Sequence, residues 1–236
     1  MFNKFTTAGL NFPAQGSAEF DGTSDYIVSG SPPISDLTNF TMSCWAYIES
    51  GASTQNLFGF TNITNDNPIA ILEYRTTNVI RFNYRTDAPV LTSTDSASIS
   101  LNNWYFVTAT KEGGNLKIYL DGSLSASNTI SDTAITINTF CIGSLVRSTI
   151  GNYMNGNLAN VAIWNRALSS DEINSVMWKS YEALSGAESN GLKAWYSLDD
   201  ITSPAASLAN MEQLAADKEA TIENKAAITA AINALS

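Results

Sequence analysis

The sequence contains no histidine, only two cysteines and little charge, since 14% of its 236 residues are Asp, Glu, Lys or Arg. Without histidine there can be no Ser-His-Asp hydrolase, no Cys-His protease, no zincin and no histidine-ligated haem. Cys44 and Cys141 are too few for a cysteine-only zinc site or for a disulfide-dense secreted scaffold. These classes of protein and site are therefore excluded.

Positive charge is also scarce, because 12 Lys and Arg face 22 Asp and Glu and the net charge is −10. Nucleic acid and anionic membranes require clustered positive charge, so neither is an expected partner. No run of about eighteen apolar residues occurs, and we expect no membrane insertion. Residues 1–6 lack a charged n-region followed by an apolar stretch, so we expect no secretory signal and synthesis in a cytoplasm.

What the sequence does contain, over residues 1–200, is many short segments rich in β-branched and aromatic residues, separated by Gly, Asn and Asp. Residues 104–110 and 116–120 are expected to be strands joined by a turn at 112–115. Asp121-Gly122 predicts a tight hairpin turn, and Asp21-Gly22 predicts a second turn of the same kind. The hydrophobic share of 44% is enough for one sizeable core.

One segment shows the alternation of a strand with two different faces. Phe40, Met42 and Cys44 lie on one predicted face with Ala46, whereas Trp45 and Tyr47 lie on the other. Short strands at this spacing predict an all-β antiparallel sandwich of the jelly-roll kind over residues 1–200.

The composition changes near residue 204, where an Ala-rich stretch without Gly or aromatic residues begins. Ser203 suits a helix N-cap and Pro204 suits the first helical position, so residues 201–236 are predicted to form a C-terminal α-helix. Its weak apolar stripe favours anchoring or oligomerisation over a lone helix in water. The residues expected to serve that role are Leu208, Met211, Leu214, Ile222, Ile228, Ile232 and Leu235.

Four stretches carry a family resemblance: residues 18–27, residues 40–46, residues 103–107 leading into 116–122, and residues 155–169 followed by Asp171-Glu172-Ile173. In their order and spacing they resemble the laminin-G-like, concanavalin A-like jelly-roll family. The resemblance extends over most of residues 17–178. Residues 191–198 resemble a family edge strand, which we expect to close the sheet.

The resemblance implies carbohydrate or protein binding, with glycan hydrolysis in distant relatives. Related glucanases use a Glu-x-Asp-x-x-Glu string that this sequence lacks. Glu73 and Asp95 are conceivable partner carboxylates, but no spacing brings them together. We therefore expect no enzyme and no catalytic residues, with a glycoside hydrolase as the third-ranked reading.

The resemblance also raises calcium, which many family members hold on loops at one edge. The candidate ligands are Asn65, Asp66, Asp21 and Asp25. Turn chemistry explains the same residues, because Asx side chains bond their own backbone in such loops. Ala159 and Asn160 stand where the family commonly has acids. No cofactor is therefore expected, and calcium is the alternative.

Aromatic and arginine side chains are the candidate ligand contacts. The residues expected to bind a glycan are Tyr74, Arg75, Arg81, Tyr84, Arg85 and Tyr153, and Trp178 also suits stacking. The other four tryptophans lie in strand motifs and are expected in the core. Cys44 and Cys141 are expected to be buried apolar residues, paired only if their strands are apposed.

These observations lead to a functional prediction. A leaderless, acidic jelly roll on a C-terminal helix resembles a non-enzymatic virion structural or adhesion protein, a phage head or tail appendage at the virion surface. Its partners would be other virion proteins or itself through the helix, and a cell-surface polysaccharide. The alternative is a monomeric bacterial extracellular lectin-like adhesin module, for which calcium is a candidate cofactor.

Overall fold

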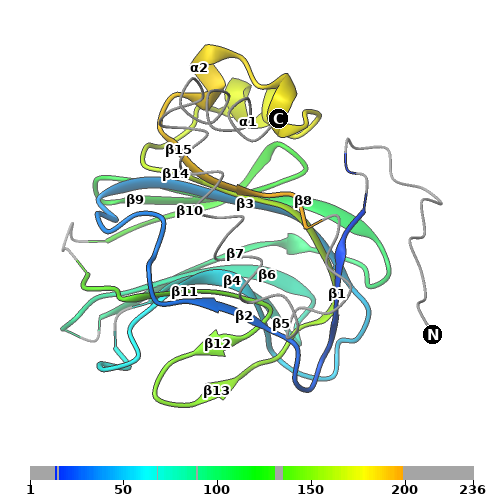
Figure 1. The fold of residues 1–236 in the computed structure, drawn as a ribbon, viewed down its shortest axis with the longest axis vertical. Helices are drawn as coiled ribbons and strands as arrows, with labels where there is room; N and C mark the ends of the chain where they lie inside the picture. Colours follow the sequence, from blue (N-terminus) through cyan, green and yellow to red (C-terminus); the bar gives the residue numbers. More distant parts are fainter. Residues whose placement is uncertain (1–13, 15, 68, 89, 131–134, 199–236) are drawn as a thin grey trace, which may run out of the picture.

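In the computed structural model, which describes residues 14, 16–67, 69–88, 90–130 and 135–198, two antiparallel sheets lie face to face (Figure 1). Sheet A contains, in spatial order, β1 (Ala18–Asp21), β14 (Asn155–Trp164), β3 (Asn39–Ile48), β8 (Trp104–Glu112), β9 (Asn115–Leu120) and β10 (Ser123–Thr129). Sheet B contains β2 (Ile27–Ser29), β11 (Thr139–Ile142), β4 (Gln55–Thr61), β5 (Ile69–Arg75), β6 (Val79–Arg85) and β7 (Leu91–Ser98). The predicted antiparallel sandwich is confirmed.

Additional elements cover the outside of each sheet. Helices α1 (Ser170–Val176) and α2 (Gly186–Ser189), with the 3-10 turn η1 (Tyr181–Ala183), lie over sheet A. A hairpin of β12 (Leu145–Val146) and β13 (Ile150–Gly151) lies on the opposite side, below sheet B (Figure 1). Strand β15 (Leu192–Tyr196) pairs with β14 at the edge of sheet A, as the family resemblance led us to expect.

The turns follow the sequence with one exception. Asp121 and Gly122 both adopt positive φ, 49° and 77°, and connect β9 to β10 as predicted. Asp21-Gly22 is not a hairpin, and that prediction was wrong. Strand β1 pairs with β14 while β2 pairs with β11, so the chain crosses here from sheet A to sheet B. The Gly22 N–H donates to the Met154 carbonyl (2.7 Å), which binds this corner to the start of β14.

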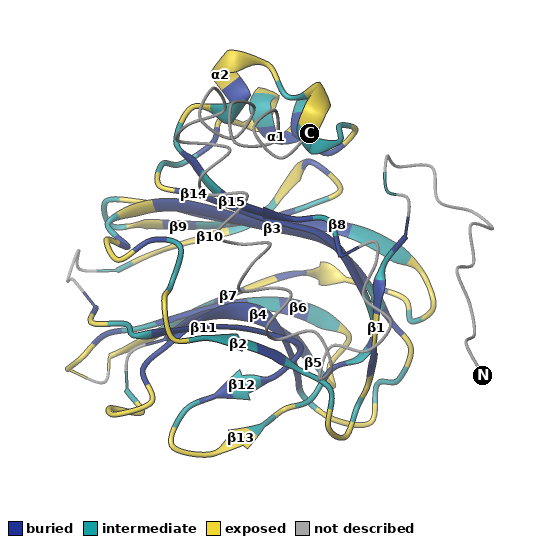
Figure 2. Ribbon diagram, in the orientation of Figure 1, coloured by how far each residue is buried: buried dark blue, intermediate teal, exposed yellow. Residues whose placement is uncertain are grey.

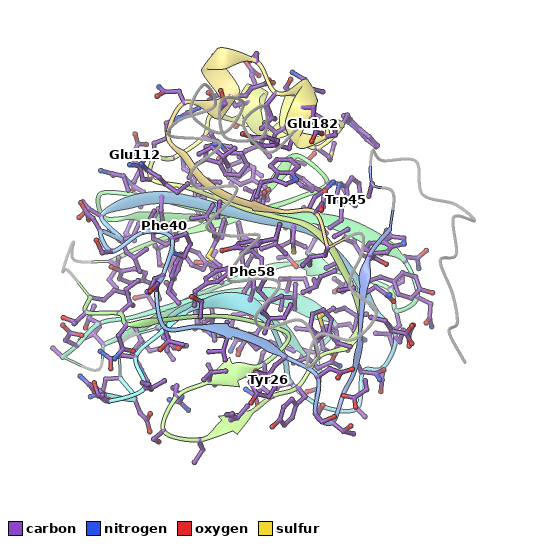
Figure 3. The ribbon with its side chains drawn as sticks, viewed as in Figure 1. Tyr26, Phe40, Trp45, Phe58, Glu112 and Glu182 are labelled. Atoms are coloured by element: carbon purple, nitrogen blue, oxygen red, sulfur yellow. The ribbon has the colours of Figure 1, made fainter. Side chains whose placement is uncertain are left out.

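Aromatic side chains fill the space between the sheets. Phe40 of β3 reaches across to Phe60 and Phe82 of sheet B, with ring centroids 6.3 and 6.1 Å apart and nearly perpendicular planes. It also stacks on Tyr84. Figure 3 shows Phe40 and Phe58 in this layer. Full burial of rings of this size supplies most of the hydrophobic free energy that joins the two sheets.

A second apolar cluster lies on the outer side of sheet A, beneath the helices. Trp45, Trp164 and Trp195 are buried there together with Ile173 of α1, and Figure 2 shows the buried inner side of the helical layer. The indole N–H of Trp45 donates to the Met177 carbonyl (3.3 Å), which attaches the layer to the sheet. These tryptophans are buried as predicted, but outside the inter-sheet core.

Two capping boxes begin the short helices. Ser169 and Glu172 exchange hydrogen bonds at the start of α1, and Ser185 and Glu188 do so at α2. Both carboxylates are also ion-paired. Arg166 holds Glu172 with bonds of 2.6 and 3.0 Å, and the Lys179 ammonium lies 2.5 Å from Glu188. The spacing Ser-x-x-Glu is the sequence signal for these helices, which the strand-based reading missed.

The free edges of the two sheets meet on the far side of the sandwich. Strand β7 of sheet B lies beside β10 of sheet A. The Ala97 N–H donates to Ser125 Oγ (2.6 Å), and Asn128 Nδ2 donates to the Ser93 carbonyl (3.1 Å). Backbone groups of an edge strand are therefore satisfied by side chains of the other sheet.

The two cysteines are buried and free. Cys44 faces the inter-sheet core. Cys141 lies between the inward residues Phe140 and Ile142 of β11, so it faces the other side of sheet B, near Asn56 (3.9 Å). No disulfide can join residues on opposite sides of a sheet.

The predicted C-terminal helix over residues 201–236 lies outside the described residues, as do its seven candidate contact residues. Among the residues that are described, no helix is long and apolar enough to cross a membrane.

Glu188 gives the helical layer a pH-dependent stability. Burial opposes ionisation, yet hydrogen bonds from Lys179, Ser175 and Ser185 lower the pKa of Glu188 from 4.5 to about 2. A carboxylate with a lowered native pKa stabilises the fold fully above its unfolded pKa, and the stabilisation is lost as the pH falls toward 2.

We therefore expect Glu188→Gln to reduce the free energy of unfolding by about 1–3 kcal/mol at neutral pH. The difference from the wild type should shrink as the pH falls from about 5 to 2. Urea titrations across that range measure it. Glu182→Gln, at an exposed glutamate of the same layer (Figure 3), is the control and should change little. A loss independent of pH would contradict the assignment.

Candidate functional site

The side of sheet B that faces away from the core carries a set of charged and polar side chains. Strand β6 alternates, with Ile80, Phe82 and Tyr84 in the core and the intervening residues outward. We call the outward group the arginine face. It consists of Glu73 and Arg75 of β5, Arg81, Asn83 and Arg85 of β6, and Asp95 of β7. The sequence placed Arg81, Asn83 and Arg85 on one face, and the structure confirms this.

Cross-strand pairing sets four of the polar residues in one row. Asn56 stands opposite Glu73, Glu73 opposite Arg81, and Arg81 opposite Asp95. Arg81 binds Asp95 with two bonds of 2.5 and 2.8 Å, in the planar geometry that arginine and carboxylate share. Glu73 is buried and accepts a hydrogen bond from Arg75 (3.1 Å). The row is thus a rigid, charged array on adjacent strands.

The Arg81–Asp95 pair remains partly open to solvent. The side chains of Arg81 and Asp95 are 27% and 42% exposed. The hydrogen bond from Arg81 lowers the pKa of Asp95, so this carboxylate stays ionised. A general acid of a glycosidase needs the opposite shift. Glu73 and Asp95 are moreover separated by β6, which places their backbones about 10 Å apart. The structure thus brings both onto one face, but holds each by an arginine.

The β12–β13 hairpin borders the arginine face. Asn56 Nδ2 donates to the Ser144 carbonyl at the base of the hairpin (2.6 Å). At its tip, Ser148 donates its N–H and its hydroxyl to the Asp66 carboxylate (2.9 and 2.6 Å). The loop over residues 62–67 and the hairpin tip are therefore fastened together.

Arg85 and Arg147 converge beside this fastening. Arg147 Nη1 donates to the Asp66 carbonyl oxygen (3.0 Å). Arg85 Nη2 donates to the same oxygen, and Arg85 Nε donates to the Asn67 carbonyl. Burial lowers the pKa of Arg85 and the charge of Arg147 lowers it further, whereas the Asp66 carboxylate acts in the opposite direction.

Two of the predicted ligand contacts are in the wrong place for that role. Tyr74 and Tyr84 are fully buried and belong to the inter-sheet core, because they alternate with the outward arginines. The Tyr74 hydroxyl donates to Asn78 (2.7 Å). Neither ring can stack on a sugar from solvent, and this correction follows from the period of two along each strand.

The two other aromatic candidates lie far from each other. Tyr153 is half-buried beside Tyr26, with centroids 6.2 Å apart, at the start of β14. Trp178 is 52% exposed and rests on Trp45, on the opposite side of the molecule. Trp178 is therefore not at the arginine face, whereas Tyr153 follows Asn152, whose carbonyl accepts from the Asn56 N–H (2.8 Å) next to the charged row.

Three of the four calcium candidates, Asp21, Asn65 and Asp66, have side chains that are hydrogen-bonded within the protein. Asp21 accepts bonds from the backbone of Thr23, Ser24 and Asp25 at 2.8–3.0 Å. Asn65 Oδ1 accepts from the Asn67 N–H (3.1 Å), and Asp66 binds Ser148. Within the described part of the chain, no three His, Cys, Asp or Glu side chains gather closely enough to share a metal ion.

The sequence did not indicate Arg147, Ser148 or Asn56. Residues 145–151 return to sheet B from more than fifty positions downstream of β6, and no local pattern predicts where such a hairpin docks. The charge of Arg147 was the one available signal, since the chain has few cations.

The fastening at Asp66 can be tested by amide exchange. We expect Asp66→Ala to reduce protection of the Ser148 N–H about tenfold, which corresponds to roughly 1.4 kcal/mol of local stability. The melting temperature should scarcely change, because Asp66 is exposed. Asp87→Ala is the matched control, since Asp87 binds the N–H and the hydroxyl of Thr136 in the same way. It should leave amide exchange at Ser148 unchanged. Unchanged exchange at Ser148 would show that the hairpin tip is held by other contacts.

Comparisons with known structures reveal the same sandwich in three lectin-like proteins. The SAP-like pentraxin of Limulus polyphemus shares 17% identity, with a TM-score of 0.57 over 68% of this chain and 81% of the pentraxin. A putative carbohydrate binding protein from Bacteroides ovatus shares 17%, with a TM-score of 0.62 over 78% of this chain and 52% of the other. The CBM40 domain of Ruminococcus gnavus IT-sialidase, bound to α2,3 sialyllactose, shares 17%, with a TM-score of 0.60 over 69% and 96%.

At this level of identity the likenesses establish the fold. A comparison with curated proteins finds no match. A family model for the concanavalin A-like lectin/glucanases superfamily matches residues 21–174, well over half of the 236 residues. The range contains most strands of both sheets, and the four motifs singled out in the sequence fall almost wholly within it. The chain therefore belongs to the concanavalin A-like lectin/glucanase superfamily.

Proposed function

We propose that this chain binds carbohydrate without hydrolysing it, and that the arginine face is the binding surface. The observation that carries the proposal is the charged row Glu73, Arg81 and Asp95 on three adjacent strands. Sugars present many hydroxyl groups that both donate and accept. A rigid array of guanidinium donors and carboxylate acceptors, part of it solvent-exposed, suits them without further reorganisation.

The similar structures support the carbohydrate part of the proposal. One is described as a putative carbohydrate binding protein, and another is a CBM40 domain solved with sialyllactose. The non-catalytic part rests on the ion pairs of Glu73 and Asp95, since each carboxylate is bound by an arginine.

The test is binding of the purified chain to a glycan array, followed by calorimetry with the best glycan. We expect the double substitution Arg81→Gln and Asp95→Asn to weaken glycan binding at least tenfold, because it removes both charged groups of the row. The net charge of the chain stays the same. The control is Lys117→Gln with Glu112→Gln on sheet A, which should stay within about twofold. Equal weakening by both pairs, or no glycan bound by the wild type, would sink the proposal. Release of reducing sugar would overturn its non-catalytic part.

We further propose, from the sequence alone, a place on a virion surface, with an extracellular adhesin as the alternative. The proposal depends on residues 201–236 acting as an anchor or oligomerisation element. Light-scattering mass of the full chain and of a chain ending at Asp200 tests it. An oligomer that becomes a monomer on truncation would support self-assembly through residues 201–236. Monomers in both cases would contradict self-assembly.

A further inference from the structure

The arginines of this chain divide into two groups by their partners. The chain has five, Arg75, Arg81, Arg85, Arg147 and Arg166. Three form ion pairs with Glu73, Asp95 and Glu172. Arg85 and Arg147 form no ion pair with a carboxylate among the residues that the structure describes. These two are also the ones that converge.

The convergence places two positive charges on one neutral acceptor. Both guanidiniums donate to the Asp66 carbonyl oxygen, while the Asp66 carboxylate is occupied by Ser148. A carbonyl oxygen carries only a partial negative charge, but the nearby Asp66 carboxylate acts electrostatically on both arginines. It offsets one of the two positive charges, so one remains. Each guanidinium has five N–H donors. These contacts use two N–H donors of Arg85 and one N–H donor of Arg147, so the other donors can bind a ligand.

The electrostatic setting singles out this spot. The chain as a whole carries −10, so an anionic ligand is repelled from most of its surface. Four of the five arginines nevertheless lie on or beside the arginine face. Its other two arginines are neutralised by their own carboxylates, whereas Arg85 and Arg147 share the single Asp66 carboxylate and keep an excess of one positive charge.

We propose that Arg85 and Arg147 together bind an oxyanion, a carboxylate or a sulfate ester, carried by the glycan that the arginine face recognises. The inference rests on the proposed function and adds a ligand class to it, an acidic glycan. Two oxygens of a carboxylate or of a sulfate group accept paired bonds from guanidinium N–H groups, and lysine does not reproduce that geometry. The oxyanion would balance the positive charge that the single Asp66 carboxylate leaves.

The first test uses simple anions, so it does not depend on which glycan is bound. Sodium sulfate and sodium acetate are titrated at constant ionic strength against sodium chloride. The readout is the Nε–Hε resonance of each arginine, assigned through single Arg→Gln variants. We expect saturable shifts for Arg85 and Arg147 and none for the ion-paired Arg166. Linear, equal shifts of all five would overturn the proposal, because they report screening alone.

The second test uses glycans. The probes are a chondroitin hexasaccharide, which bears carboxylates only, its sulfated form, and its carboxyl-reduced neutral form. We expect at least tenfold tighter binding of one acidic form than of the neutral one. Arg85→Gln or Arg147→Gln should abolish that preference, with Lys117→Gln as the control. Should either variant unfold, Arg85→Lys or Arg147→Lys replaces it and should weaken the preference.

The outcomes separate the two proposals. The neutral form could bind as tightly as the acidic forms and lose its binding in the Arg81→Gln, Asp95→Asn variant. That result would support the carbohydrate function and refute the oxyanion site at Arg85 and Arg147. Saturable shifts of the Arg85 and Arg147 resonances with simple anions, without binding of any array glycan, would support the oxyanion site and refute the glycan function. Neither shifts nor glycan binding would refute both.

Discussion

The structure depends on the contact of Phe40 with the rings of sheet B. A single side chain of β3 touches Phe60, Phe82 and Tyr84, and so connects sheet A to β4 and β6 together. Because successive residues of a strand point to opposite sides, fixing the rings of β6 inward fixes Arg81, Asn83 and Arg85 outward. A one-residue slip would exchange the two sets, and the core therefore determines the register of the candidate binding face.

The same constraint explains which parts of the fold the sequence could predict. Alternation and turn chemistry predicted β3, β8, β9 and the Asp121-Gly122 hairpin, because these are local properties. The turn at Asp21-Gly22 was misjudged because its positive φ is shared with hairpins, while the partner of β1 is β14, far along the chain. The burial of Tyr74 and Tyr84 could have been predicted by applying the alternation of β5 and β6 to the aromatic residues as well as to the arginines.

The candidate site was predictable in part. The three arginines of β5 and β6 were identified from their types and spacing. The pairing of Arg81 with Asp95 could not be predicted, because Asp95 comes from a different strand, β7. The position of Arg147 and Ser148 could not be predicted either, because their hairpin docks through long-range contacts. Two short helices were signalled by Ser-x-x-Glu patterns, which matter here because they cover Trp45 and Trp164 and leave the outside of sheet B as the polar side of the sandwich.

The meeting of β7 and β10 has a consequence for how such modules behave when crowded. An edge strand normally offers a row of open N–H and C=O groups to any neighbouring chain. Here Ser125 and Asn128 of one sheet reach the backbone of Ala97 and Ser93 in the other. Two positions that a foreign strand would bind are thereby occupied from within. Many copies held side by side can thus remain separate folded units more easily, since part of the β7 backbone is closed to a strand of a neighbouring copy.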